Sequence, residues 1–509
     1  MEKIKEILFL LVIMVIAVFA RVWDLDSIPP GIWPDEAING MQAIEEPGKL
    51  FYPENQGREG LMMWLNSLSF SFLGVSIFSF RIAPAIIGIL TVLAVYLLAR
   101  EMFRKRNAAL MAAFFCATSF WHINFSRIDF RAILLPLVLC LAFYFLFLGI
   151  RKKNVWPQIG AGIFFGLGFY TYTTFRLSVL ILAAALFFWR LKTRKEGCLK
   201  NFFANAAIML ATTFIVALPI GLYFVNGHMD QFFGRTGAVS VFGQPHPLNA
   251  FIESFWRHLG MFNIYGDPNW RHNYSGDPQL FWPVGLMFLA GWWVLAKNIK
   301  SFWQSKNWNA LLPNAVLFIW FWAMILPAML TYEGMPHCLR AIGVIPAVFI
   351  LAGLGGNFLF EKLKEKIPSK KSVAAITAII LLFSGIMPIW RYFGDWASRP
   401  ETARAFTFEL ARMGEFLTDN APAGFEKVAV MYGGDLPARS VQLAAMAKDE
   451  NDDPIRLIWP EHIESISADE KAVVLFMINN SQDINNFKQR FPDYRELATG
   501  QNFRAFLTN

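Results

Sequence analysis

Long apolar runs recur along most of the chain, separated by short polar connections. A helix needs roughly 20 apolar residues to cross a bilayer, and eleven runs come near that length. They lie at about 7–23, 79–99, 107–121, 132–150, 155–175, 177–190, 202–225, 281–296, 311–330, 341–360 and 372–390. Hydrophobic residues make up 55% of the chain and charged residues only 17%. The pattern therefore predicts a polytopic α-helical membrane protein with about eleven transmembrane helices, and it excludes an ordinary soluble enzyme.

Basic residues cluster in every second connection between these runs. The clusters are Lys3 and Lys5; Arg100, Arg104, Lys105 and Arg106; Arg151, Lys152 and Lys153; Arg190, Lys192, Arg194, Lys195 and Lys200; Lys297, Lys300 and Lys306; and Lys362, Lys364, Lys366, Lys370 and Lys371. Because cytoplasmic loops of membrane proteins collect Lys and Arg, the alternation predicts a cytoplasmic amino terminus in a multi-pass protein of the cell membrane. The net charge of +8 is thus explained by topology, and no nucleic-acid partner is expected. A cleaved signal peptide is the alternative interpretation of the first run.

The other connections are expected outside the cell, and they include the long ones. They cover about 24–78, 122–131, 226–280, 331–340 and everything after 391. Residues 391–509 hold 18 acidic against 13 basic side chains and no spanning run. A helix at 400–418 and strands at 427–432, 455–459 and 472–478 are predicted there. We therefore expect a transmembrane module over 1–390 and a soluble extracytoplasmic α/β domain over 391–509.

The first external loop (24–78) carries an acidic pair at a predicted helix start. Pro34 is suited to the first turn, so Asp35 and Glu36 follow where the helix dipole favours ionised carboxylates. The helix is expected to lie on the membrane face, and 61–73 is expected to form a second interfacial or re-entrant helix. Such carboxylates can act as a base or as metal ligands, or they can simply cap the helix.

Cationic and polar side chains gather in the connections expected outside, where basic residues should be scarce. The candidates for binding an anionic ligand are Arg58, Glu59, Arg127, Arg131, His337 and Arg340, together with Tyr172 and Arg176 at the outer turn between the fifth and sixth runs. A single arginine could instead reach toward lipid headgroups. Here, however, four connections each supply an arginine, which indicates an anionic ligand. His337 and Arg340 are three positions apart, so one helical turn would present both to a single anion.

Cysteine and histidine spacing gives no metal or redox motif. The four cysteines form no CxxC pair, so neither a disulfide framework nor a zinc site is predicted. Histidines 228, 246, 258 and 272 show no HExxH spacing and are interpreted as surface or packing residues. The aromatic stretch 251–282 fits either an interfacial belt or a stacking platform for sugars.

Several strings together resemble the GT-C superfamily of integral-membrane glycosyltransferases, in the protein O-mannosyltransferase and aminoarabinose-transferase-like branch (glycosyltransferase family 39-like). The strings are Pro34-Asp35-Glu36-Ala37 after the first span, Phe80-Arg81-Ile82-Ala83-Pro84, Phe125-Ser126-Arg127 with Phe130-Arg131-Ala132, and Gly168 to Thr173 with Phe175-Arg176. The resemblance covers about residues 1–390. It implies inverting transfer of a sugar from a polyprenyl-phosphate donor on the outer face, with Asp35 at the catalytic acidic position and Glu36 beside it.

The chemistry that the resemblance implies needs a base and cations, because the phosphate is already a good leaving group. The acceptor is a protein, glycan or lipid hydroxyl. No cofactor is required; the sequence leaves a divalent metal open, with Asp35 and Glu36 as its ligands. The alternatives are a multi-pass transporter or lipid flippase and a non-catalytic scaffold. Transporters usually show midplane polar residues and inverted repeats, whereas the charged residues here lie at the span ends.

Overall fold

The computed structural model describes residues 2–232, 239–305, 307–450, 453–467, 469–477, 480–499 and 503–508. The chain divides into two compact units. Unit 1 comprises residues 1–23, 49–62 and 84–396, and unit 2 comprises 24–48, 63–83 and 397–509. The boundary at 396/397 lies close to the one expected at 390/391. Two segments of the first long loop, however, group with the carboxy-terminal part of the chain.

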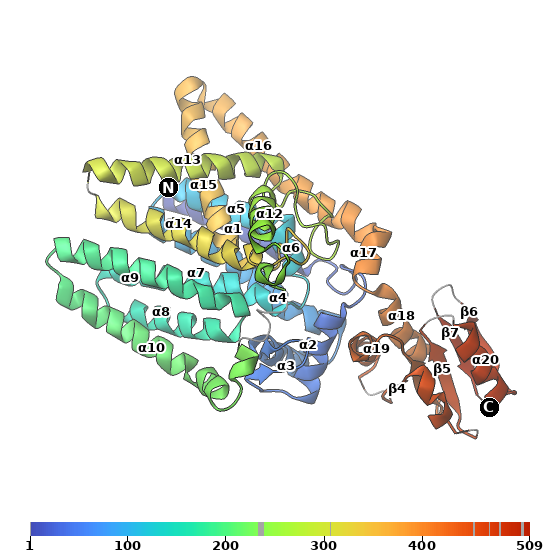
Figure 1. Ribbon diagram of the computed structural model, residues 1–509. Helices are drawn as coiled ribbons and strands as arrows, with labels where there is room; N and C mark the ends of the chain where they lie inside the picture. The colour runs from blue at the N-terminus through green and yellow to red at the C-terminus, as the bar shows by residue number, and fades with distance from the viewer. Residues whose placement is uncertain are drawn as a thin grey trace. The chain divides into compact units, whose positions relative to one another are not determined.

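Unit 1 is a bundle of helices (Figure 1). Its long elements are α1 (Glu2–Val22), α4 (Ile77–Phe103, which begins in unit 2), α5 (Arg106–Thr118), α7 (Leu134–Lys152), α8 (Trp156–Leu167), α9 (Ser178–Lys195), α10 (Leu199–Val225), α13 (Trp282–Ser305), α14 (Trp308–Met329), α15 (Ile345–Lys366) and α16 (Lys370–Trp390). Each overlaps one predicted run. Seven apolar helical stretches among the described residues are long enough to cross a membrane, which marks a multi-pass membrane protein; eleven crossings stay a prediction.

Small residues allow three of these helices to pack closely. A Cβ on Gly355 of α15 would lie 1.8 Å from the Met287 carbonyl oxygen of α13, and one on Gly291 of α13 would lie 2.0 Å from that of Leu351. On another face of α15, a Cβ on Gly353 would lie 2.3 Å from the Ala108 carbonyl oxygen of α5. Side chains here would push the helices apart, so glycine sets their separation, as in many membrane bundles.

Three of the segments predicted to be cytoplasmic meet at one end of the bundle. Arg100 at the end of α4 pairs with Glu6 of α1 (Nε to Oε1, 2.9 Å), and Arg151 at the end of α7 pairs with Glu101 (2.6 Å). Arg131, just before α7, is separated from Arg151 by a helix about 28 Å long. These three segments therefore lie at the end of α7 opposite Arg131.

The carboxy-terminal part of unit 2 is a small α/β fold, as predicted. A five-stranded sheet runs in the order β4 (Arg456–Ile458), β3 (Glu426–Val430), β5 (Ala472–Phe476), β7 (Arg504–Leu507) and β6 (Arg495–Thr499). The first three strands are parallel, and β7 is antiparallel to both β5 and β6. Helices α18 (Phe408–Asn420) and α19 (Asp435–Lys448) cover one face, and α20 (Ser481–Arg490) covers the other.

Two details of this domain differ from the sequence prediction. The helix expected over 400–418 is two helices, α17 (Pro400–Ala405) and α18, because Thr407 between them has a φ of +48°. Strands β6 and β7 were not predicted. Polar residues such as Arg495, Glu496 and Arg504 interrupt their apolar pattern, and these side chains pair across the two strands, Glu496 with Arg504.

The two helices predicted in the first long loop are both present, as α2 (Pro34–Glu45) and α3 (Leu61–Leu73). The expectation that α2 lies on the membrane face does not fit its burial. Most of its residues are buried, and it packs against α19, where a Cβ on Gly40 would lie 2.8 Å from Leu443 Cδ2. The apolar face of α2 is therefore covered by protein.

Candidate functional site

The acidic pair lies in the first turn of α2, as the sequence predicts. Pro34 is the first helical residue; Asp35 is partly buried, and Glu36 is fully buried. Glu36 Oε1 accepts a hydrogen bond from the backbone N–H of Trp33 at 3.2 Å, which is half of a capping box. Glu36 thus helps to hold the helix start in place. The chemical role of the pair stays a prediction.

Arg81 fixes the loop that leads into α2, a role that sequence reasoning missed. Its Nη1 donates to the Pro29 carbonyl at 2.8 Å, and its Nη2 donates to the Gly31 carbonyl at 2.6 Å. Gly31 has a φ of +77°, and a Cβ there would lie 2.6 Å from the Phe406 carbonyl oxygen. In the sequence, Phe80-Arg81 stands out only through the family resemblance, which gives Arg81 no role. Its function here is to orient the segment that carries Asp35.

A two-stranded hairpin positions Arg58 and Glu59 in unit 1. Strand β1 (Phe51–Tyr52) pairs antiparallel with β2 (Arg58–Glu59). A Cβ on Gly60 would lie 2.1 Å from the Lys49 carbonyl oxygen, so only glycine fits where the hairpin leaves β2. Arg58 and Glu59 are 1% and 2% exposed. Two charged side chains so deeply buried need partners.

The partners of Glu59 come from two other loops that the sequence assigned to the same face. Arg131 Nε lies 2.9 Å from Glu59 Oε2, and Thr173 Oγ1 lies 3.2 Å from Oε1. Arg176 Nη2 is 3.8 Å from the same Oε1. The Arg131 guanidinium also stacks over Tyr172, 5.4 Å from the ring centre. Four predicted ligand-binding residues therefore meet here, with one carboxylate facing two guanidinium groups.

Arg127 contacts backbone carbonyls and aromatic rings. Its Nη2 donates to the Trp23 carbonyl at 2.7 Å and its Nη1 to the Ala20 carbonyl at 3.4 Å. Its guanidinium lies over the rings of Tyr392 and Phe393, at 5.8 and 5.0 Å. Arg127 thus satisfies carbonyls at the carboxyl end of α1. This placement does not favour a role in anion binding.

The connection 331–340 is not the helical turn that was expected. It contains turns and a cis Met335–Pro336 bond. Arg340 Nη2 pairs with Glu333 Oε2 at 2.8 Å, whereas His337 Nδ1 lies 4.0 Å from Asp267 Oδ2. The prediction that both present themselves to one anion through a helical turn is therefore wrong, because turn geometry gives the two side chains different partners.

Asp267 is the centre of a buried polar cluster that the sequence did not reveal. Asp267 Oδ2 accepts hydrogen bonds from His272 Nδ1 (3.1 Å) and from the backbone N–H of Cys338 (2.9 Å), and Oδ1 accepts one from that of Asn269 (2.9 Å). Although burial opposes ionisation, His272 and these hydrogen bonds keep the pKa of Asp267 below its usual range. Burial lowers the pKa of His272 and, far more, that of His337.

The histidines of the large loop are only in part the surface or packing residues expected. His246 is exposed, but His258 and His272 are buried and hydrogen-bonded. His258 Nε2 accepts a hydrogen bond from the backbone N–H of His337 at 3.1 Å, and burial lowers the pKa of His258 to about 4. No spacing motif could have revealed this cluster, because its members lie on segments far apart in the sequence.

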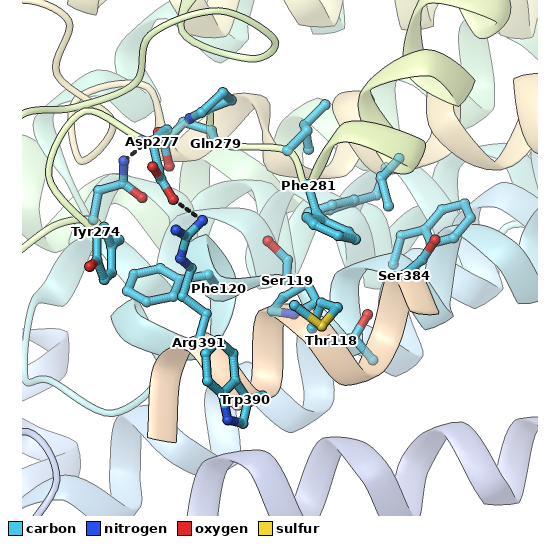
Figure 2. Close-up of a pocket in the computed structure, with 18 residues that line it drawn as sticks. Thr118, Ser119, Phe120, Tyr274, Asp277, Gln279, Phe281, Ser384, Trp390 and Arg391 are labelled. Carbon is cyan, nitrogen blue, oxygen red and sulfur yellow. Dashed lines mark hydrogen bonds and ion pairs between the residues drawn. The ribbon is translucent and has the colours of Figure 1, made fainter. Parts of the chain in front are cut away.

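A separate pocket of about 160 Å³ lies among α5, α16 and the segment 273–281 (Figure 2). Its walls are mostly apolar, but the side-chain amide of Gln279 and the hydroxyls of Ser119 and Ser384 are buried there without hydrogen-bond partners. Asp277 and Arg391 form an ion pair at its edge. The Arg391 guanidinium lies 4.4 Å from the centre of the Tyr274 ring. The pocket has the apolar walls and few polar groups typical of a site for a small amphiphile.

Comparison with known proteins agrees with this architecture. The family model described as dolichyl-phosphate-mannose-protein mannosyltransferase matches residues 61–223. ArnT from Cupriavidus metallidurans is similar in its apo state (TM-score 0.58, 12% identity, 98% of this chain and 97% of that chain) and bound to undecaprenyl phosphate (TM-score 0.55, 13% identity, the same coverage). No curated protein sequence matches this chain.

A second similar structure is larger. The archaeal oligosaccharyltransferase AglB from Archaeoglobus fulgidus, in complex with an inhibitory peptide and a dolichol-phosphate, matches with a TM-score of 0.54 at 16% identity. The match covers 87% of this chain but only 64% of AglB, so this chain spans less than two thirds of that protein. The fold of this chain is therefore that of the GT-C superfamily of integral-membrane glycosyltransferases, as the sequence motifs indicated.

Proposed function

We propose that this protein is an inverting glycosyltransferase that moves a sugar from a polyprenyl-phosphate-linked donor to an acceptor hydroxyl on the extracytoplasmic face. The observation that carries the proposal is the Glu59 cluster, in which the guanidinium groups of Arg131 and Arg176 both face one carboxylate in the interior of the protein. Phosphate is the ligand that such guanidinium groups suit best. The fold supports the donor class, because similar structures hold undecaprenyl phosphate and a dolichol-phosphate.

The reaction needs only what these residues can supply. The acceptor oxygen attacks the anomeric carbon while the bond from that carbon to the phosphate oxygen breaks, and Asp35 takes the acceptor proton. The polyprenyl phosphate leaves with the bonding electrons, and Arg58, Arg131 and Arg176 stabilise its charge. Arg340 is a further candidate for a contact to the donor. A single displacement of this kind inverts the anomeric configuration, and it requires no cofactor.

Replacement of Asp35 by Asn tests the base. We expect Asp35→Asn to melt close to wild type, because Asn is nearly isosteric with Asp, and to lose at least about 100-fold in transfer rate. The assay supplies a panel of polyprenyl-phosphate sugars, follows their consumption, and determines the anomeric configuration of the product by NMR. A transporter or flippase would consume none of these donors.

The matched control for this variant is Asp26→Asn, which removes an exposed carboxylate from the same loop and should leave transfer unchanged. If Asp35→Asn kept more than about a tenth of the wild-type rate, the base would have to be sought elsewhere. Retention of configuration in the product would contradict the single displacement.

The proposed orientation places the amino terminus in the cytoplasm and residues 391–509 outside. It rests on the basic clusters, three of which meet at the Glu6, Arg100 and Arg151 end of the bundle. Protease added to intact spheroplasts should then remove the carboxy-terminal domain. Protection of that domain until the membrane is lysed would reverse the orientation.

A further inference from the structure

Three side chains with metal-binding atoms converge in unit 1. They are Asp267, His272 and His337, and their ligand atoms all lie within 4.8 Å of one another. Asp267 Oδ2 is 3.1 Å from His272 Nδ1 and 4.0 Å from His337 Nδ1. In a tetrahedral zinc site with bonds of about 2.1 Å, ligand atoms are about 3.4 Å apart. The two distances bracket that value.

Hydrogen bonding alone does not satisfy this cluster. His272 Nδ1 reaches the Asp267 carboxylate, but His337 Nδ1 is buried and has no hydrogen-bond partner. Its distance of 4.0 Å from Asp267 Oδ2 is too long for a hydrogen bond. A buried nitrogen without a partner is costly, and a cation would remove that cost.

The surroundings also hold the three side chains in fixed positions. The backbone N–H groups of Cys338 and Asn269 both bind the Asp267 carboxylate. His258 Nε2 accepts a hydrogen bond from the backbone N–H of His337 and so fixes the segment that carries the His337 imidazole. Partners of this kind orient ligands in metal sites and raise their affinity. The side chain of His272 is 3% exposed and that of Asp267 is 1% exposed, while His337 at 14% gives a path for entry.

We propose that Asp267, His272 and His337 bind one divalent metal ion of the zinc class. Two imidazoles and one carboxylate favour Zn²⁺, Co²⁺ or Fe²⁺ over Mg²⁺ or Ca²⁺, which prefer oxygen ligands alone. Binding requires the proton of His272 to sit on Nε2, so that Nδ1 offers its lone pair. Three protein ligands leave a fourth position for water or another oxygen ligand. The site is distinct from Asp35 and Glu36, and it does not depend on the proposed glycosyl transfer.

The test is metal stoichiometry in the full-length protein. The purified protein is stripped with EDTA, titrated with Zn²⁺, and the bound zinc is measured by mass spectrometry; Co²⁺ serves as a second probe through its visible absorption. We expect one tightly bound zinc ion per chain and the intense Co²⁺ bands of a four-coordinate site. His337→Asn keeps a hydrogen-bond donor near Nδ1 but removes the imidazole, and should weaken zinc binding by at least about 100-fold.

The control variant is His246→Ala, which removes an exposed histidine from the same long loop and should bind zinc as wild type does. Melting curves in EDTA establish that both variants are folded, and Asp267→Asn or His272→Gln replaces His337→Asn if that variant does not fold. The proposal is overturned if wild type binds no more zinc than His337→Asn, or if the variant that removes a ligand keeps the wild-type affinity and Co²⁺ spectrum.

Discussion

The two ends of α7 each pair an arginine with a glutamate, yet the two pairs differ in what surrounds them. At one end Arg131 and Glu59 are 9% and 2% exposed; at the other, Arg151 is 40% exposed and Glu101 is 8% exposed. The distances are alike, 2.9 and 2.6 Å. A pair whose arginine is exposed contributes less to stability, because water and salt screen it. Separating a buried pair leaves a charge without compensation in a medium of low dielectric constant.

Each glutamate has a second arginine nearby, and the burial of that arginine also differs between the two ends. Arg104 joins Arg151 at Glu101, but its side chain is 53% exposed and water solvates it. Arg176 joins Arg131 at Glu59, and its side chain is only 21% exposed. A surplus guanidinium inside the protein favours an anionic ligand, whereas one at the surface is typical of a basic cytoplasmic loop. Burial, more than sequence, separates the candidate site from a topological signal.

Removing Arg131 should produce the largest effect. Arg131→Ala leaves Glu59 buried beside a single, more distant guanidinium, and we expect a loss of about 3–5 kcal/mol in folding stability. Arg151→Ala should cost about 1 kcal/mol or less. Melting temperatures of the two variants in the same detergent measure the difference. Equal effects would mean that burial does not distinguish the two ends of α7.

A double variant separates the ion pair from the rest of the environment. Glu59→Gln combined with Arg131→Met removes both charges while keeping similar volumes, and it should be more stable than Arg131→Ala alone. If transfer is still lost in this double variant, the charges serve the donor as well as the fold. Transfer at the wild-type rate would leave the pair with a structural role only.

The sequence was sufficient to predict those elements whose formation depends on the hydrophobic pattern. Each predicted apolar run contains a helix, and the α/β character of the carboxy-terminal part was recognised from alternating strands. The Glu59 cluster was predictable in kind, since Arg131, Tyr172 and Arg176 were placed on one face from topology. The role of Arg127 was not, because an arginine that binds backbone carbonyls has the same sequence signature as one that binds phosphate.

The Asp267 cluster and the position of α2 could not be predicted for a related reason. Asp267 and His337 are separated by 70 positions, and only the packing of α13, α14 and α15 brings their segments together. The apolar face of α2 suggested a membrane partner, but α19 packs against α2. Hydrophobic periodicity shows which face is buried, and it does not identify what buries it.

Removing Arg176 should have an intermediate effect, mainly on the donor. Arg176 lies 3.8 Å from Glu59, and its guanidinium is 3.7 Å from the centre of the Phe232 ring. Arg131 still neutralises Glu59 in Arg176→Ala, so melting should change little. If the surplus charge binds the donor phosphate, its KM should rise about tenfold, the equivalent of about 1.4 kcal/mol, and Arg176→Lys should recover part of that. Titration of the donor at a fixed acceptor concentration measures this KM. An unchanged KM would mean that Arg176 only packs against its neighbours and does not contact the donor.

The smallest effect is expected at Arg340, which tests a third kind of arginine–glutamate pair. Its side chain is 14% exposed, but its partner Glu333 is 69% exposed and only 2.8 Å away. Because water solvates Glu333 when the pair separates, Arg340→Ala should change folding stability by less than about 1 kcal/mol.

Arg340 can also exchange its exposed partner Glu333 for the donor phosphate. We therefore expect a rise of a few fold in donor KM, which Arg340→Lys reverses in part because Lys offers a point charge in place of a bidentate contact. Glu333→Gln is the informative control. It removes the charge of the partner but keeps the Glu333 backbone carbonyl that accepts a hydrogen bond from Arg340 Nη1, and it should lower the donor KM if Arg340 contacts the phosphate. If neither variant alters KM or kcat, Arg340 only anchors the 331–340 connection, and the phosphate contacts lie with Arg58, Arg131 and Arg176.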